Sequence, residues 1–200
     1  MTKIKLCGLS RPCDIHTANE LLPEYIGFVF WGKSKRYVSD DQAEELKKNL
    51  SPSIKAVGVF VNESPEKIAE LISRGIIDMA QLHGGEDNDY IKRLRQLTDA
   101  EIIKAFRVRT QADIEEAEKC AADHILLDSG MGSGNTFEWE FLRGIERPYF
   151  LAGGLDQRNA AEAVKTLHPF ALDVSSGIET DGKKDAAKMT AFVKAVRNRS

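Results

Sequence analysis

Four residues that can move protons stand at or near the ends of short apolar runs. They are Cys7 in "KLCG", His83 in "QLHG", Asp128 in "LLDS" and Asp173 in "ALDV". Thiol, imidazole and carboxyl groups are side chains that serve as general acids and bases. Each also has an ordinary structural explanation, since a strand cysteine often packs as a small hydrophobe and an aspartate often caps a turn. The set therefore predicts acid–base chemistry only if the fold brings its members together.

Two segments rich in small residues predict a phosphate site. The segment "FLAGGL" carries Gly153 and Gly154, and "DVSSGIE" carries Ser175, Ser176 and Gly177. Small residues let backbone N–H groups approach a phosphate, and a helix N-terminus adds partial positive charge. The first segment alone is also typical of a tight turn, but two such segments after successive strands favour phosphate.

A third small-residue segment, "GMGSGNTFEW" (130–139), has a different character. It lacks the G-x-G-x-x-G spacing of a dinucleotide-binding loop and leads into aromatic residues. We interpret it as a loop that covers the substrate.

Eight short β-type runs recur along the chain, and most intervals between them carry charge-rich sequence of helical character. The predicted strands cover residues 4–8, 25–30, 56–61, 78–84, 101–108, 124–129, 148–154 and 171–177. Eight such units leave two α/β architectures, an open doubly wound sheet or a closed (βα)8 barrel. The count favours a single compact (βα)8 TIM barrel that occupies residues 1–200 as one domain.

Residue alternation along the predicted strands supports a barrel with a polar mouth. Side chains two residues apart on a strand share a face, and the ends of barrel strands meet at one rim where active sites are built. The polar residues assigned in this way to the inner face are Lys5, Cys7, Gln81, His83, Asp128, Asp173 and Ser175. The opposite face of the same strands is mostly apolar, as expected for strands covered by helices.

Composition excludes several other classes of protein. The net charge of −3 predicts no basic face for nucleic acid or for an anionic membrane, and no apolar run approaches the roughly 20 residues that span a bilayer. The start of the chain does not resemble a signal peptide, so we expect a cytoplasmic protein. Three cysteines without C-x-x-C spacing predict free thiols, and no two histidines have the spacing of metal ligands.

Seven motifs, in order along nearly the whole chain, resemble a known family. They are "KLCGLS", "GFVFWGKSKRYVS", "VGVFVN", "QLHGGE", "LLDSGMGSGNTFEW", "LAGGL" and "DVSSGIETDGKKD". Together they resemble the phosphoribosylanthranilate isomerase family of tryptophan biosynthesis. That family is a (βα)8 barrel that converts N-(5-phosphoribosyl)anthranilate into 1-(2-carboxyphenylamino)-1-deoxyribulose 5-phosphate by an Amadori rearrangement. The resemblance implies a small-molecule substrate and no metal or organic cofactor. The sequence leaves a monomer and a homodimer as alternatives.

The resemblance also implies roles for individual residues. Cys7 matches the general base of the family, Asp128 its general acid, and Arg36 the arginine that meets the anthranilate carboxylate. Gly154 and Ser176 fall in the phosphate loops. The matches to residues that line the substrate pocket are Gln81, His83 and Asp173. The chain departs from the family pattern at Lys35, Asn135 and Thr180-Asp181, positions that bear on loop shape and affinity.

The thiol of Cys7 suits a base that takes a proton from carbon, because a thiolate is weakly hydrated and a nearby cation can lower its pKa. Cys7 is interpreted as a proton carrier and not as a covalent nucleophile. Lys5, on the same predicted face, is expected either to lower the pKa of this thiol or to form a structural ion pair.

Two alternative functions stay open at this point. One is another phosphosugar aminoaldose–ketose isomerase on the same barrel, although such enzymes typically carry an aspartate where this chain has Cys7. The other is a barrel without catalysis that binds a phosphate ligand. A turnover assay distinguishes the two classes.

Overall fold

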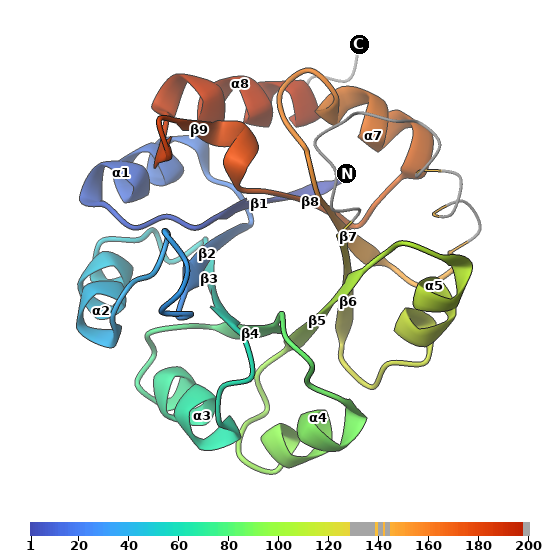
Figure 1. Cartoon of the computed structure of the whole chain (residues 1–200). Coiled ribbons are helices and arrows are strands. Elements are labelled where there is room, and N and C mark those ends of the chain that lie inside the picture. Colours follow the sequence, from blue (N-terminus) through green and yellow to red (C-terminus); the bar gives the residue numbers. More distant parts are fainter. Residues whose placement is uncertain (129–138, 140–141, 143–144, 198–200) are drawn as a thin grey trace.

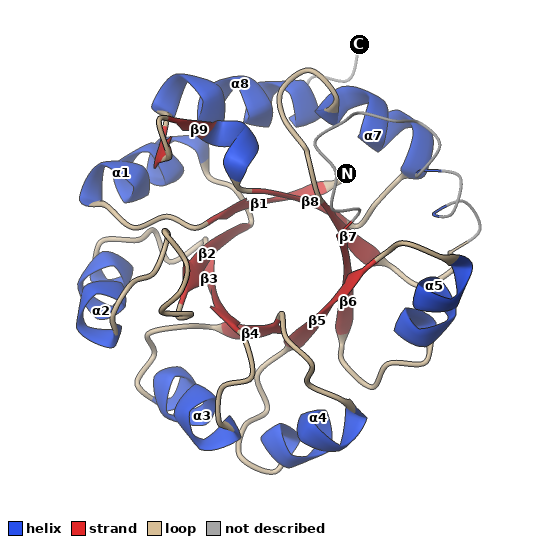
Figure 2. Cartoon of the chain, in the orientation of Figure 1, coloured by secondary structure: helices blue, strands red, loops and turns tan. Residues whose placement is uncertain are grey.

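Eight parallel strands close into a barrel surrounded by helices (Figures 1 and 2). The computed structural model describes residues 1–128, 139, 142 and 145–197. The barrel strands are β1 Lys3–Cys7, β2 Tyr25–Val29, β3 Lys55–Phe60, β4 Met79–Leu82, β5 Ile102–Arg107, β6 His124–Asp128, β7 Tyr149–Ala152 and β8 Ala171–Val174. Each strand pairs with the next in sequence, and β8 returns to β1 through Asp173 opposite Lys5. The predicted closed barrel is confirmed.

Helices follow the strands and cover the outside of the barrel. Those in the described residues are α1 Pro12–Leu21, α2 Asp40–Lys48, α3 Pro65–Ser73, α4 Asn88–Arg95, α5 Gln111–Glu118, α7 Ala160–Leu167 and α8 Ala186–Arg197. Several of them begin with a side-chain cap. The side chains of Ser39, Ser64 and Asp87 accept hydrogen bonds from the backbone of the first turns of α2, α3 and α4.

The chain between β8 and α8 has local structure of its own. A short 3-10 helix, η2 Ser176–Ile178, is followed by a small antiparallel hairpin of β9 Glu179–Thr180 and β10 Lys183–Lys184. The predicted strand 171–177 therefore ends early, because its last three residues turn into this segment. The predicted strand 148–154 also ends early, since Gly153 and Gly154 adopt positive φ values of 94° and 62°.

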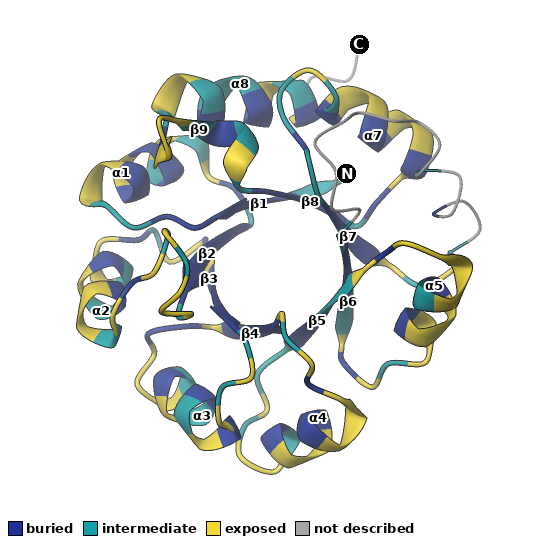
Figure 3. Cartoon of the chain, viewed as in Figure 1, coloured by how far each residue is buried: buried dark blue, intermediate teal, exposed yellow. Residues whose placement is uncertain are grey.

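Alternating side chains divide the interior into two regions. One face of each strand packs against the helices, and Figure 3 shows the strands buried while the outer faces of the helices are exposed. The other face fills the barrel, whose apolar cluster comprises Tyr25, Val57, Met79, Ile103, Leu126, Phe150, Ala152 and Ala171. Lys5 and Asp173 lie inside the barrel as a buried pair. Cys7, Val29 and Val59 form a further cluster, and these three line the cavity described below.

Candidate active site

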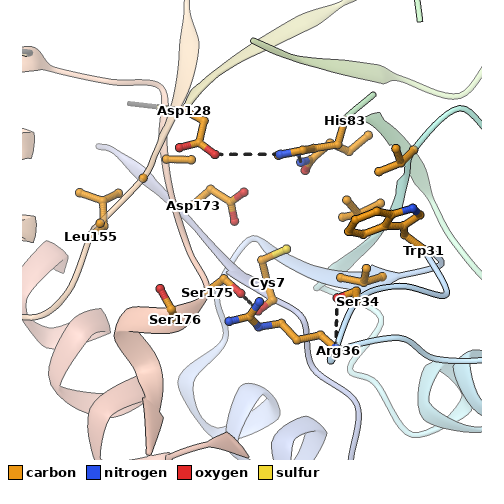
Figure 4. Close-up of a pocket in the computed structure, with 17 residues that line it drawn as sticks. Cys7, Trp31, Ser34, Arg36, His83, Asp128, Leu155, Asp173, Ser175 and Ser176 are labelled. Atoms are coloured by element: carbon orange, nitrogen blue, oxygen red, sulfur yellow. Dashed lines mark hydrogen bonds and ion pairs between the residues drawn. The ribbon is translucent and has the colours of Figure 1, made fainter. Parts of the chain in front are cut away.

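A cavity of about 440 Å³ opens at the carboxyl ends of the strands (Figure 4). The carboxyl-terminal face is where enzymes with a (βα)8 barrel carry their active sites. The predicted site residues that line it are Cys7, Arg36, Gln81, His83, Asp128, Gly153, Gly154, Asp173, Ser175 and Ser176. Gly177 does not line the cavity and instead packs against the loop after β7, as described below. The cavity also has apolar walls from Val29, Trp31, Val59, Val61 and Leu155.

Cys7 ends β1 with its side chain in the cavity and only 8% of the residue exposed. Burial raises the pKa of the thiol, and the nearby ammonium groups of Lys5 and Lys184 act in the opposite direction. The expected lowering by Lys5 is thus present, but burial outweighs it. The backbone at Cys7 is fixed by Ser175, whose hydroxyl donates to the Cys7 carbonyl oxygen at 3.1 Å.

Lys5 and Asp173 form an ion pair inside the barrel, with Nζ 2.9 Å from Oδ2 and side-chain exposures of 0% and 7%. Burial is the largest single influence and acts to lower the pKa of Lys5, but the Asp173 carboxylate and the Cys7 side chain together outweigh it, so the pKa is raised and the lysine is charged. The second oxygen of Asp173, Oδ1, is buried with no hydrogen-bond partner among the described residues. Because Asp173 lines the cavity, this oxygen is suited to accept a hydrogen bond from a ligand hydroxyl.

Asp128 and His83 approach each other across the ends of β6 and β4. His83 Nε2 lies 4.0 Å from Asp128 Oδ2, and Gln81 Nε2 lies 2.9 Å from His83 Nδ1. An amide nitrogen can only donate, so this contact leaves the imidazole proton on Nε2, the nitrogen that faces Asp128. Burial lowers the pKa of His83 although Asp128 opposes the shift, so the imidazole is neutral near pH 7.

The two predicted phosphate loops lie against each other. A Cβ atom added at Gly177 would lie 1.9 Å from the carbonyl oxygen of Leu155, which no side chain permits. Gly177 therefore allows the loop after β8 to contact the loop after β7, and Gly154 and Ser176 both line the cavity from these loops. The assignment of Gly177 to the phosphate site stays a prediction, and the structure adds that its missing side chain permits this close packing.

Arg36 enters the cavity from the loop between β2 and α2. A Cβ atom at Gly8 would lie 2.5 Å from Arg36 Cδ, so the glycine after Cys7 leaves room for the arginine. The Arg36 guanidinium donates to both oxygens of Glu179, from Nε to Oε1 at 2.5 Å and from Nη2 to Oε2 at 2.9 Å. Lys184 Nζ donates to the same Oε1 at 2.7 Å.

Glu179 and Lys184 are site residues that the sequence reasoning missed. They lie in the hairpin β9–β10, and Arg36 lies 143 positions before Glu179, a separation at which no local pattern links them. The signal that was available is the Asp181-Gly182 pair between two short runs, which is typical of a two-residue hairpin turn. The departure noted at Thr180-Asp181 falls in this hairpin, where Asp181 and Gly182 adopt φ values of 50° and 75°.

One predicted feature falls mostly outside the residues that the structure describes. The predicted covering loop at 130–139, with Asn135, lies outside them apart from Trp139. Within the described part of the chain, no three His, Cys, Asp or Glu side chains gather to hold a metal ion. In that same part, no helix combines the length and apolar character that crossing a membrane requires.

The chain is similar to proteins of one family along almost its whole length. The family model for N-(5'-phosphoribosyl)anthranilate (PRA) isomerase matches residues 4–195. The N-(5'-phosphoribosyl)anthranilate isomerase of Thermoanaerobacter sp. (strain X514) is 43% identical over 204 residues, which cover 98% of each chain.

Solved structures give the same result. Phosphoribosyl anthranilate isomerase from Thermotoga maritima superposes with a TM-score of 0.91 at 37% identity, over 98% of this chain and 99% of that chain. A phosphoribosyl anthranilate isomerase in complex with reduced 1-(o-carboxyphenylamino)-1-deoxyribulose 5-phosphate has a TM-score of 0.87 and 36% identity over 98% and 99% of the two chains. The chain belongs to the N-(5'-phosphoribosyl)anthranilate isomerase family.

Proposed function

We propose that this chain, as one barrel domain over residues 1–200, isomerises N-(5'-phosphoribosyl)anthranilate with Cys7 as general base and Asp128 as general acid. The observation that carries the proposal is the shared cavity, which holds a thiol, a carboxyl group, an arginine and two small-residue loops. Its contents correspond to the parts of this substrate, a sugar carbon skeleton between an aryl carboxylate and a phosphate. The product is 1-(2-carboxyphenylamino)-1-deoxyribulose 5-phosphate.

The first step opens the furanose ring. Asp128 gives a proton to the ring oxygen, the bond between this oxygen and C1′ breaks, and the lone pair of the anilino nitrogen forms the C1′=N bond of a cationic Schiff base. Asp128 is then a carboxylate. The neutral His83, whose Nε2 proton faces Asp128 from 4.0 Å, is placed to donate to that carboxylate after a small movement.

The second step moves a proton between carbons. The thiolate of Cys7 takes the proton from C2′, which the adjacent iminium group has acidified, and the electron pair forms the C1′=C2′ bond of an enolamine. Protonation at C1′ and loss of the hydroxyl proton at C2′ then give the ketone. No atom is gained or lost, so the reaction needs proton carriers and no oxidant.

Binding residues hold the two ends of the substrate. Arg36 is assigned to the anthranilate carboxylate, because its planar guanidinium matches a carboxylate with two parallel hydrogen bonds. The loops with Gly154 and Ser176 are assigned to the phosphate. Asp173 is assigned to a sugar hydroxyl through its unpartnered Oδ1, and Trp31 to the wall beside the aryl ring.

Purified protein tests the proposal in a fluorescence assay that follows the loss of phosphoribosylanthranilate. We expect turnover that persists in EDTA. A loss of activity in EDTA that zinc or magnesium restores contradicts the acid–base mechanism, and no turnover under any condition supports a phosphate-binding barrel without catalysis. We further propose that the enzyme acts in the cytoplasm, without nucleic acid or membrane, as a monomer or a homodimer. A solved relative from Thermotoga maritima is described as a dimeric protein from which monomers were generated.

A further inference from the structure

The side chain of Arg36 is oriented by a carboxylate from the other end of the chain. Glu179 accepts hydrogen bonds from Nε and Nη2 of Arg36 at 2.5 and 2.9 Å. The Glu179 side chain is only 6% exposed, whereas that of Arg36 is 22% exposed and lines the cavity. The pair is therefore shielded from water on the side of Glu179 and open toward the substrate on the side of Arg36.

The contact with Glu179 uses one edge of the guanidinium and leaves another edge available. Arginine has five N–H donors, of which Glu179 takes one on Nε and one on Nη2. The two donors on Nη1 and the second donor on Nη2 have no partner among the described residues. These form the terminal fork that binds a carboxylate with two hydrogen bonds. In Figure 4 the guanidinium extends below Cys7 toward Ser175.

Lys184 fixes Glu179 in turn. Its side chain is 2% exposed, and Nζ donates to Glu179 Oε1 at 2.7 Å, to the Ser175 carbonyl oxygen at 2.9 Å and to Ser175 Oγ at 3.2 Å. Ser175 also donates to the carbonyl oxygen of Cys7. A continuous set of hydrogen bonds therefore connects Arg36 with the backbone of the proposed base.

The hairpin of β9 and β10 holds Glu179 and Lys184 side by side. Glu179 and Lys184 are direct cross-strand partners, and the turn at Asp181 and Gly182 has the positive φ angles of a two-residue hairpin. Glu179 also carries one negative charge against three cations, Arg36, Lys184 and the more exposed Lys35, whose Nζ lies 3.5 Å from Oε2. The cluster keeps an excess positive charge, which favours an anionic ligand at the free edge of Arg36.

We propose that Glu179, held by Lys184, is a positioning residue that orients Arg36 and thereby sets the preference of the enzyme for a carboxylate on the aryl ring. The proposal rests on the proposed function, because that function assigns Arg36 to the substrate carboxylate. Glu179 does not contact substrate in this account. It acts only through the arginine.

Binding of two ligands distinguishes a loss of Arg36 orientation from a general loss of order in the site. One is reduced 1-(o-carboxyphenylamino)-1-deoxyribulose 5-phosphate, and the other is the same compound with an unsubstituted phenyl ring. For Glu179→Gln, we expect the affinity for the first ligand to fall about tenfold, as for the loss of one charge-assisted hydrogen bond, while affinity for the second changes less than about twofold. The KM should rise by a similar factor, with a smaller change in kcat. The control variant is Glu45→Gln, since the Glu45 side chain is 71% exposed and does not line the cavity.

Two further variants test whether Glu179 acts through Arg36. In an Arg36→Lys background, Glu179→Gln should cause no additional loss of selectivity, because the two residues act as one unit. Glu179→Asp, which keeps the charge and shortens the side chain, should give an intermediate loss and replaces Glu179→Gln if that variant does not fold. Equal losses for both ligands, or no loss, overturn the positioning role. If the unaltered protein neither turns over phosphoribosylanthranilate nor binds the carboxylated ligand, the proposed function itself fails.

Discussion

Replacing Lys5 by methionine tests the buried ion pair that Lys5 forms with Asp173 near the thiol of Cys7, the proposed base. Methionine fills a similar volume without charge and leaves the carboxylate of Asp173 unpaired inside the barrel. Removal of one partner of a buried pair costs about 3–5 kcal/mol. With an unfolding entropy of about 2.1 cal/mol/K per residue, a chain of 200 residues has about 0.4 kcal/mol/K. The expected decrease in Tm is therefore about 7–12 °C.

Thermal unfolding followed by circular dichroism at pH 7 measures this effect. The double variant Lys5→Met/Asp173→Asn should recover part of the lost Tm, because it removes the unpaired charge. Lys48→Met is the control, since Lys48 is 57% exposed and its ion pairs with Glu44 and Glu45 lie at the surface. If Lys5→Met unfolds within about 2 °C of the unaltered protein, the pair does not have the energetic role that its burial implies.

Three further predictions concern the reaction. Arg36→Lys keeps the charge but loses the planar fork, so KM should rise more than kcat falls in steady-state assays; a variant that binds substrate normally removes Arg36 as the carboxylate ligand. Gly177→Ala places a methyl group against the Leu155 carbonyl, and should lower the stability by about 1–3 kcal/mol and raise the KM, whereas unchanged denaturant unfolding and KM contradict the close packing. In the proposed mechanism the active form of Cys7 is the thiolate, and burial raises its pKa, so kcat should increase with pH above neutrality and fall as the pH decreases. Lys5→Met should move this rise of kcat to higher pH, and a rise at the same or lower pH refutes the role of Lys5.

Much of the architecture follows from strand spacing and alternation. The eight apolar runs predict eight strands, and the two-residue spacing within the pairs Lys5/Cys7 and Gln81/His83 places their side chains inside the barrel. Of these, Cys7, Gln81 and His83 line the cavity. These features are local, and a repeat of two residues along a strand fixes which side chains face inward. The helix after β7 begins at Ala160, and Asp156 holds the turn before it by accepting a hydrogen bond from the Arg158 backbone N–H.

Long-range pairing and burial are the parts that the sequence does not provide. The contact of Arg36 with Glu179 depends on the closed barrel, which brings the loop after β2 beside the hairpin after β8. The direction of the Cys7 pKa depends on how far burial outweighs two nearby cations, which no motif encodes. The sequence predicts Gly177 only as a glycine of a phosphate loop. The structure adds that the carbonyl oxygen of Leu155 lies too close for any side chain at this position.

The most direct test of the account is a deuterium isotope effect with substrate labelled at C2′. Cys7→Ser should show a large primary isotope effect because proton abstraction from carbon becomes limiting, and Asp128→Asn a small one because ring opening becomes limiting. Each variant should lose at least about 10²-fold in turnover, as is typical of general acid–base groups. Reversed isotope effects would exchange the roles of acid and base. Near-normal turnover with Cys7→Ala would contradict the central claim that this thiol is the base.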